Sequence, residues 1–247
     1  MDPDVPHYFY AINLLAQAGL LLTLAIGLAV AVQRTELTAQ QKAATWIAIM
    51  ATLVIWFGVA LWLGQGGVFL ARTSLVPPIP FAIGLPIVAG LDILLSSPRF
   101  RAVIDAVPQS WMTGVQVYRA LGAMFLALWL QGRMPGEFAL PAGMGDVIVG
   151  LTALIVAWLN ATRSPSARVA TVIWNVFGIA DLVIAVGTGF LTSPSPYQML
   201  AFDHPNALIA QHPFVLVPTF FVPLSIILHL LSLWKLRRAD SAKPAFA

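Results

Sequence analysis

Cysteine is absent from this chain of 247 residues, and charged residues make up only 9% of it. The lack of cysteine excludes disulfide bonds, thiolate metal sites, iron–sulfur clusters and cysteine nucleophiles. Because soluble domains carry about 25% charged residues, the scarcity of charge indicates an integral membrane protein. The formal net charge of +3 is small and the basic residues are scattered, which argues against a nucleic-acid partner.

Catalytic sequence motifs are missing as well. The chain has no HExxH, no GxSxG and no phosphate-binding glycine loop. An intramembrane hydrolase could be built from Asp92 and Asp181, but nothing in their surroundings singles that chemistry out. The sequence therefore favours a non-enzymatic role.

Hydrophobic residues, in contrast, make up 59% of the chain and form seven runs of membrane-spanning length. A signal peptide begins with basic residues, and the N-terminal segment of this chain has none. We therefore expect the first run to remain as a helix. The sequence predicts an all-α integral membrane protein: a seven-transmembrane-helix bundle forms one domain over residues 1–236, and residues 237–247 form a disordered cytoplasmic tail. The predicted spans are 9–32, 43–65, 77–97, 112–132, 140–160, 169–191 and 213–234.

The basic residues predict the orientation of these spans, because cytoplasmic loops are enriched in Lys and Arg. If the N-terminus lies outside and the C-terminus in the cytoplasm, the outer loops receive only Arg72 and Arg133. We therefore expect this orientation, in a bacterial cytoplasmic (inner) membrane. The cytoplasmic side would then receive Arg34, Lys42, Arg99, Arg101, Arg163, Arg168, Lys235, Arg237, Arg238 and Lys243.

An arginine interrupts the fourth apolar run. Arg119 lies about two helical turns inside it, where an uncompensated charge is costly. Asp92, Asp146 and Asp181 each lie in a different apolar run and could compensate it. We therefore expect a buried Arg–Asp cluster at the centre of the protein. Gly122 shares a helix face with Arg119, as is typical of a closely packed interior helix.

Further polar residues fall at overlapping depths, and the inner cluster is expected to combine Asp92, Arg119, Asn175, Asp181 and His229. It would bind a polar ligand or relay protons, or else it only holds the helices together. Asp146 lies near a helix N-terminus, where the backbone dipole favours a carboxylate, so part of its role would be structural. The candidate residues for ligand binding or a proton relay are Arg119, Asp92, Asp181, Asp146, Asn175, His229, Gln116 and Tyr118.

Prolines interrupt the outer halves of the third and seventh spans. Pro77, Pro78, Pro80 and Pro86 predict an irregular start of the third span, and Pro213, Pro218 and Pro223 predict the same of the seventh. Irregular backbone at membrane depth is tolerated against protein or a water-filled cavity. These segments are therefore expected to line an outer vestibule that leads to Arg119 and the aspartates.

The sequence also predicts the location of three other segments. Tyr10, Asn13 and Gln17 share one face of the first helix and should point into the bundle. Residues 98–110 are expected to form a short amphipathic helix on the inner leaflet. The long outer connection 192–211 has an apolar middle, which would lie in the membrane interface or fold back over the bundle.

Cofactor sites have weak support. The outer residues His7, Asp203, His204 and His212 are plausible zinc or copper ligands, although their spacing matches no metal motif. A buried bis-His haem needs two histidines at one depth, whereas only His229 lies inside a span. Retinal is disfavoured, since it needs a lysine deep in the last helix and Lys235 lies at its end. We expect no bound cofactor.

These observations lead to three hypotheses. The first is a transporter or channel-like protein for a small polar solute or protons, because broken helices beside charged groups at mid-depth are typical of transporters. The second is a membrane-embedded enzyme or a haem- or metal-binding redox protein. The third is a non-catalytic receptor or assembly subunit. The expected partners are the lipid bilayer and a small polar solute or proton, and the sequence leaves oligomerisation open.

Overall fold

The computed structural model describes residues 6–70 and 75–241. The chain is 81% helical, and the described residues contain no strand. Within these ranges, seven helices are long and apolar enough to cross a membrane, which confirms the predicted all-helical membrane protein. They are α1 (His7–Gln33), α2 (Ala39–Gln65), α3 (Pro78–Ser96), the fourth span (Gln109–Leu130), α7 (Gly136–Ala161), α8 (Ala167–Thr192) and the seventh span (Val217–Ala239).

Two of these spans are composite. The fourth consists of α5 (Gln109–Gly114), a 3₁₀ segment η2 (Val115–Gly122) and α6 (Ala123–Leu130). The seventh begins with a π-helical turn η4 (Val217–Phe221) and continues as α9 (Val222–Ser241). Because α9 reaches Ser241, the predicted start of a disordered tail at residue 237 is wrong, and the rest of that tail lies outside the described residues.

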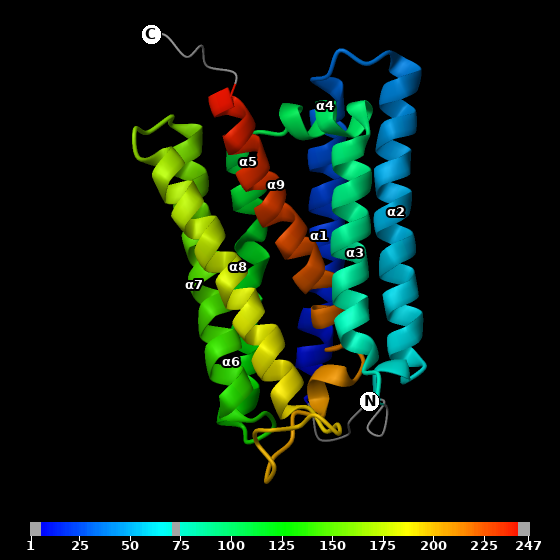
Figure 1. Cartoon of the computed structure of the whole chain (residues 1–247), viewed down its shortest axis with the longest axis vertical. Helices are drawn as coiled ribbons and strands as arrows, with labels where there is room; N and C mark the ends of the chain where they lie inside the picture. The colour runs from blue at the N-terminus through cyan, green and yellow to red at the C-terminus, as the bar shows by residue number, and fades with distance from the viewer. Residues whose placement is uncertain (1–5, 71–74, 242–247) are drawn as a thin grey trace.

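The seven spans run alternately up and down, so that α1 begins at the end of the bundle opposite to the end of α9 (Figure 1). α7 packs against α8 and against the whole fourth span, while α9 packs against α3 and α8. The seventh span is the most buried of the seven and α3 is the least. The last helix is therefore the central one, and residues on it can meet residues from both sides of the bundle.

The prolines act differently in the two helices that they were expected to disturb. α3 is a continuous helix from Pro78 to Ser96, with Pro86 in its interior, so the predicted irregular start is wrong. Proline is tolerated in the first turn of a helix, where its missing N–H has no partner to lose. In the last span, Pro218 and Pro223 fall at the π-helical turn and just after it, and this irregularity confirms the prediction.

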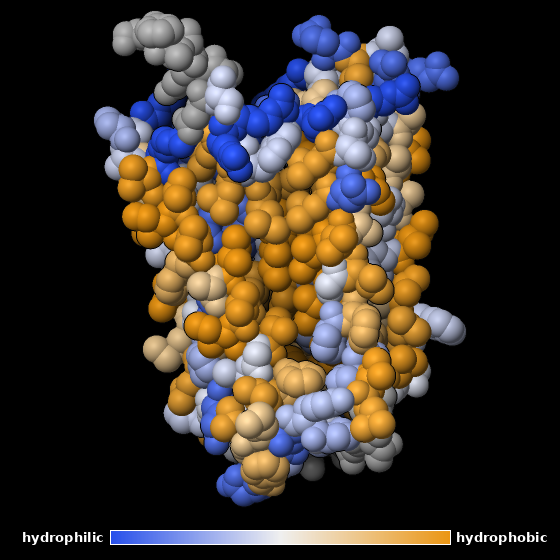
Figure 2. Space-filling model, in the orientation of Figure 1, coloured by the Kyte–Doolittle hydropathy of each residue, from blue (hydrophilic) through white to orange (hydrophobic). Residues whose placement is uncertain are grey.

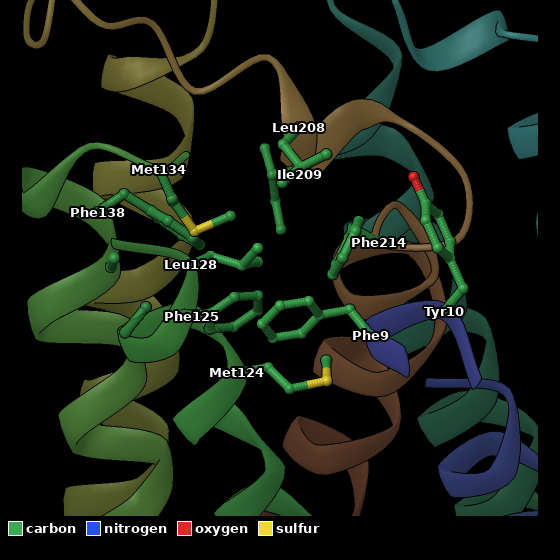
Figure 3. Close-up of a cluster of buried hydrophobic side chains, with 12 residues drawn as sticks. Phe9, Tyr10, Met124, Phe125, Leu128, Met134, Phe138, Leu208, Ile209 and Phe214 are labelled. Atoms are coloured by element: carbon green, nitrogen blue, oxygen red, sulfur yellow. The ribbon is translucent and has the colours of Figure 1, made fainter. Parts of the chain in front are cut away.

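An apolar cluster from α1, α6, α7 and the connection before the last span lies at the end of the bundle where α1 begins (Figure 3). Phe9 of α1 and Phe125 of α6 meet Phe214, which precedes η4. Leu208 and Ile209 of the short helix η3 (Leu208–Ala210) join them. The long connection before the last span therefore folds back over the bundle, which was one of the two expected alternatives.

The opposite end carries the short helix α4 (Pro98–Ala106), which confirms the predicted helix between the third and fourth spans. It lies across the bundle beside the end of α9 (Figure 1). An apolar belt covers the middle of the visible face, and hydrophilic residues gather most densely at this end (Figure 2). Such a belt is the surface expected of a protein surrounded by lipid.

Candidate functional site

Arg119 lies at the centre of the bundle and pairs with two carboxylates from two other helices. Its Nε donates to Oδ1 of Asp146 on α7 at 2.7 Å, and its Nη2 donates to Oδ2 of Asp181 on α8. The Arg119 side chain is only 2% exposed. The structure thus contains a buried Arg–Asp cluster made by Arg119, Asp146 and Asp181.

The 3₁₀ segment η2 positions the arginine. A 3₁₀ helix has three residues per turn, so Gln116, Arg119 and Gly122 come to lie on one buried face. Runs of 3₁₀ helix longer than three or four residues are uncommon, and in mid-helix they often mark a functional hinge or strain. The arginine therefore sits in the most unusual backbone of its span.

The third guanidinium nitrogen, Nη1, contacts groups of α8 and α9. Arg119 Nη1 donates to the carbonyl oxygen of Gly178 at 3.3 Å and lies 3.2 Å from Nε2 of His229. Because a guanidinium can only donate, Nε2 of His229 must accept, and the ring proton is then on Nδ1. Nδ1 lies 2.8 Å from the Asn175 side-chain oxygen, to which it donates.

The polar chain continues from Asn175 toward the end of the bundle that carries α4. Asn175 donates to Ser232 Oγ at 2.9 Å, and Gln109 donates to the same oxygen at 2.5 Å. A proton relay through His229, one of the expected roles, would have to pass the Asn175 amide, which donates hydrogen bonds but is not an acid–base group. The arrangement instead fixes the orientation of the guanidinium, as an outer shell of hydrogen bonds does for a bound ion.

Glycines make room for the cluster. A Cβ on Gly145 would overlap the Asp181 carboxylate, and a Cβ on Gly122 would overlap the side chain of Asp146. At Gly178 a Cβ would overlap the His229 ring. Only glycine at these three positions lets the helices approach closely enough for the carboxylates and the imidazole to reach Arg119.

The cluster has one more carboxylate than it has cationic groups. Arg119 is the single cation, Asp146 and Asp181 are the two acids, and His229 serves as an acceptor. Four of the five guanidinium N–H groups are taken up by these contacts and the Gly178 carbonyl. One carboxylate oxygen of each acid, Oδ2 of Asp146 and Oδ1 of Asp181, accepts no hydrogen bond from a described residue, but the Asp146 side chain is 16% exposed against 7% for Asp181. Asp146 is thus the more exposed of the two acids.

Two cavities meet at Asp146. The inner cavity, of about 60 Å³, is bordered by Arg119, Tyr118 and Ser225, and by Asn13 of the predicted buried stripe on α1. The second cavity, of about 100 Å³, lies between α3, α8, the folded-back connection and η4, and is called the outer cavity because the sequence predicts this end of the bundle to be outside. Both are lined by Phe125, Asp146, Leu182, Val217 and Val222.

The outer cavity corresponds to the vestibule that the proline pattern predicts. Pro77, Pro78 and Pro80 border it from the start of α3, and Pro218 borders it from η4. Its wall is nearly all apolar, with polar side chains only at Asp146, Ser193 and Ser195 among the described residues that line it. The expected ligand was a small polar solute, and a nearly all-apolar wall is not what such a solute requires. The wall instead favours a ligand with an apolar part.

Two of the candidate residues for ligand binding or a proton relay are not paired with the cluster. Asp92 lies with Ala89 and Ser96 on an exposed face of α3 and forms no ion pair with any described residue, so its place beside Arg119 is wrong. Helical spacing groups these three residues but does not say whether their face points inward. Gln116 is completely buried beside Arg119 in η2, yet neither of its amide atoms has a hydrogen-bond partner among the described residues.

The outer histidines do not form a metal site. Within the described ranges, no group of three or more His, Cys, Asp or Glu residues is arranged to hold a metal ion. His7 at the start of α1 is exposed, as are Asp203 and His204 in the connection before the last span. His212 is partly buried, and burial lowers its pKa. The expectation of zinc or copper ligation by these four residues is therefore not met.

Residues 76–237 match a protein family described as a domain of unknown function (DUF8737). The match begins just before α3 and includes Arg119, Asp146, Asp181 and His229, so the whole charged cluster lies inside it. No curated protein and no solved structure matches the chain.

Proposed function

The chain belongs to the DUF8737 family, and we propose that it is a small membrane transporter whose solute or proton binds at Asp146. The observation that carries this proposal is the position of Asp146. It contacts the Arg119 guanidinium and lines both the outer and the inner cavity. Broken or irregular helices beside charged groups at mid-depth are the pattern of transporters, and η2 and η4 both border the inner cavity.

The charge balance of the cluster explains why Asp146 would bind a cation. With both acids ionised, Arg119, Asp146 and Asp181 carry a net charge of −1 in a medium where an uncompensated charge is costly. Uptake of a proton or another cation by Asp146 neutralises the cluster. We assign the switching role to Asp146 because it lines both cavities, whereas Asp92 is exposed on α3 and forms no ion pair with a described residue.

The backbone supplies elements that could change conformation. The 3₁₀ segment η2 carries Arg119, and the π-helical turn η4 carries Val217 and Phe221, which line the inner cavity. Both kinds of segment recur at hinges and functional sites. We propose that neutralisation of Asp146 loosens its pairing with Arg119 and lets these two segments open the cavity toward the other side.

The proposed orientation is N-terminus outside and C-terminus inside, in a bacterial-type inner membrane. It is supported by the hydrophilic band at the end of the bundle that carries α4 and the end of α9 (Figure 2). Arg99 and Arg101 of α4 and Arg238 of α9 belong to this end, as expected for the cytoplasmic side. The vestibule would then open outward.

A rival role has its own support. A buried ion cluster with four satisfied guanidinium donors could simply fix the packing of η2, α7, α8 and α9 in a non-transporting receptor or assembly subunit. The two roles differ in what happens when Asp146 loses its charge but keeps its shape. Removing the charge of a purely structural acid leaves solute uptake unchanged, whereas removing the charge of a switching acid changes it.

The test is uptake into liposomes that contain the purified full-length protein. A defined mixture of amino acids, sugars, polyamines and small carboxylic acids is supplied outside with a pH gradient across the membrane, and mass spectrometry identifies what accumulates inside. We expect at least one solute to accumulate with the wild type and not with Asp146→Asn. Asp92→Asn, which changes an acid of α3 outside the cluster, should behave like the wild type.

Either of two results would refute the proposal. The wild-type protein could move nothing that empty liposomes do not, in either direction of the gradient. Alternatively, Asp146→Asn could transport as well as the wild type while remaining folded. The second result would favour the structural role of the cluster.

A further inference from the structure

We infer that the outer cavity takes a small organic cation with an apolar body, such as an alkyl- or arylammonium, whose positive group binds Asp146. This inference rests on the proposed function and names the class of solute. It follows from three features of the same cavity: its apolar wall, its single charged side chain and the aromatic rings that line it.

The wall of the outer cavity matches an apolar body. Ile79 and Ile83 come from α3, Val186 from α8, and Val217 and Val222 from the last span. Burying such surface against an apolar ligand is favourable by about 25 cal/mol per Å². Sugars and other strongly hydrated solutes would lose their hydrogen bonds with water here without gaining others, since burying a polar group that stays unpaired is unfavourable.

Asp146 is the single charged side chain among the described residues that line the outer cavity. Its free oxygen Oδ2 accepts no hydrogen bond from the described part of the chain. An ammonium group supplies both the hydrogen-bond donor and the positive charge that this oxygen lacks. An anion, in contrast, would meet no open cation, because the Arg119 guanidinium is already bound by two carboxylates, a carbonyl and His229.

Aromatic rings add a second reason to prefer a cation. Phe125 and Phe138 line the outer cavity together with Asp146, and their ring centroids lie 5.3 Å apart in an edge-on arrangement (Figure 3). Phe69 and Phe190 border the same cavity. A cation near the face of such a ring is attracted by its negative centre. A neutral molecule of the same shape gains the apolar contacts but not this attraction.

The organic cation and a proton would compete for the Asp146 carboxylate. Because only one of them binds at a time, the protein would exchange the cation for a proton. The charged and titratable groups that surround Asp146 are Arg119 and Tyr118 from η2, Asp181 from α8 and His229 from α9. α3 contributes only apolar residues to the cavity, and α1 contributes Asn13 and Ala16. No other open acid among the described lining residues would hold the ammonium when Asp146 is protonated.

The experiment compares three probes of nearly equal size on the purified full-length protein: benzylammonium, benzyl alcohol and benzoate. Calorimetric titrations are run at pH 8 and pH 6. We expect benzylammonium to bind at pH 8 about tenfold or more tightly than benzyl alcohol, the factor for one charge-assisted hydrogen bond. Its binding should weaken at pH 6, and benzoate should not bind.

Two variants separate charge from shape. Asp146→Asn should remove the preference for benzylammonium over benzyl alcohol. Ala185→Leu, which adds bulk to the wall of the outer cavity and leaves Arg119, Asp146 and Asp181 unchanged in sequence, should weaken both ligands together. Should Asp146→Asn fail to fold, the Ala185→Leu protein and the pH dependence of the wild type still decide the question.

The outcomes also separate this inference from the proposed function. Equal binding of benzylammonium and benzyl alcohol, or binding of benzoate, would overturn the inference. If none of the three binds while the uptake assay finds a different, Asp146-dependent solute, the substrate class is wrong and the transporter stands. If the protein transports nothing, the proposed function itself fails.

Discussion

Gly145 of α7 and Asp181 of α8 are in such close contact that a single methyl group on the glycine would overlap the carboxylate. The contact explains how Asp181 reaches Arg119 from a neighbouring helix. It also means that the ion pair depends on a residue with no charge. Gly145 stands directly before Asp146, so one turn of α7 supplies both an acid and the space for the other acid.

Gly145→Ala should therefore destabilise the protein by about 1–3 kcal/mol, the usual effect of forcing extra volume into a packed interior. Gly187→Ala in α8 is the matched control, because no atom lies within 4 Å of the Cβ that it would add. Helix propensity alone predicts that this control is neutral or slightly stabilising. Thermal unfolding in detergent, followed by the fluorescence of the eight tryptophans, compares the two. Equal melting temperatures would contradict the close contact.

Removing Arg119 should show that the two buried acids depend on its positive charge. Arg119→Gln leaves Asp146 and Asp181 buried without a cation, and breaking a buried pair in this way costs about 3–5 kcal/mol. The double variant Arg119→Gln with Asp181→Asn restores the original net charge of the cluster and should recover much of the melting temperature. Neither protein should transport.

The recovery in the double variant is the decisive measurement for this prediction. If the single variant Arg119→Gln is as stable as the wild type, the pairing contributes little to folding. If the double variant regains both stability and uptake, Arg119 is dispensable and the proposed site is wrong.

Much of the fold could be predicted from the sequence, because the length and composition of an apolar run are enough to identify a membrane-spanning helix. The fourth span was recognisable in this way in spite of Arg119, since its other residues are apolar enough. The contacts of α1 were also partly predictable. The spacing of Tyr10, Asn13 and Gln17 groups them on one face, and the structure buries all three.

The partners of Arg119 were only partly predictable, for a physical reason. Spacing shows which residues share a helix face, but it does not show which face points inward or which helices are neighbours. Asp92 and Asp181 therefore looked equivalent, although one is exposed on α3 and the other pairs with Arg119. The 3₁₀ geometry of η2 left no signal in its residues. The role of Gly145 could not be anticipated without the packing of α7 on α8.

His229 should act as a positioning residue for the arginine and not as a titrating group in transport. His229→Gln keeps an oxygen that can accept from Arg119 Nη1, whereas His229→Phe leaves that N–H buried without a partner. An unsatisfied buried donor costs about 1–3 kcal/mol, so the phenylalanine variant should melt lower than the glutamine variant. The pH profile of uptake should be the same in His229→Gln as in the wild type. A shifted profile would show that the imidazole itself takes up the proton.

The orientation of the bundle can be tested without background, because the chain has no cysteine of its own. His204→Cys places a thiol at an exposed position before the last span, at the end of the bundle predicted to be outside. Ser166→Cys places a thiol at an exposed position between α7 and α8, at the opposite end. With the N-terminus outside, a membrane-impermeant maleimide should label His204→Cys in intact cells. Ser166→Cys should be labelled only after the membrane is opened. The reverse pattern would place the vestibule and Asp146 on the cytoplasmic side, so that the proposed solute would enter the site from the cell interior.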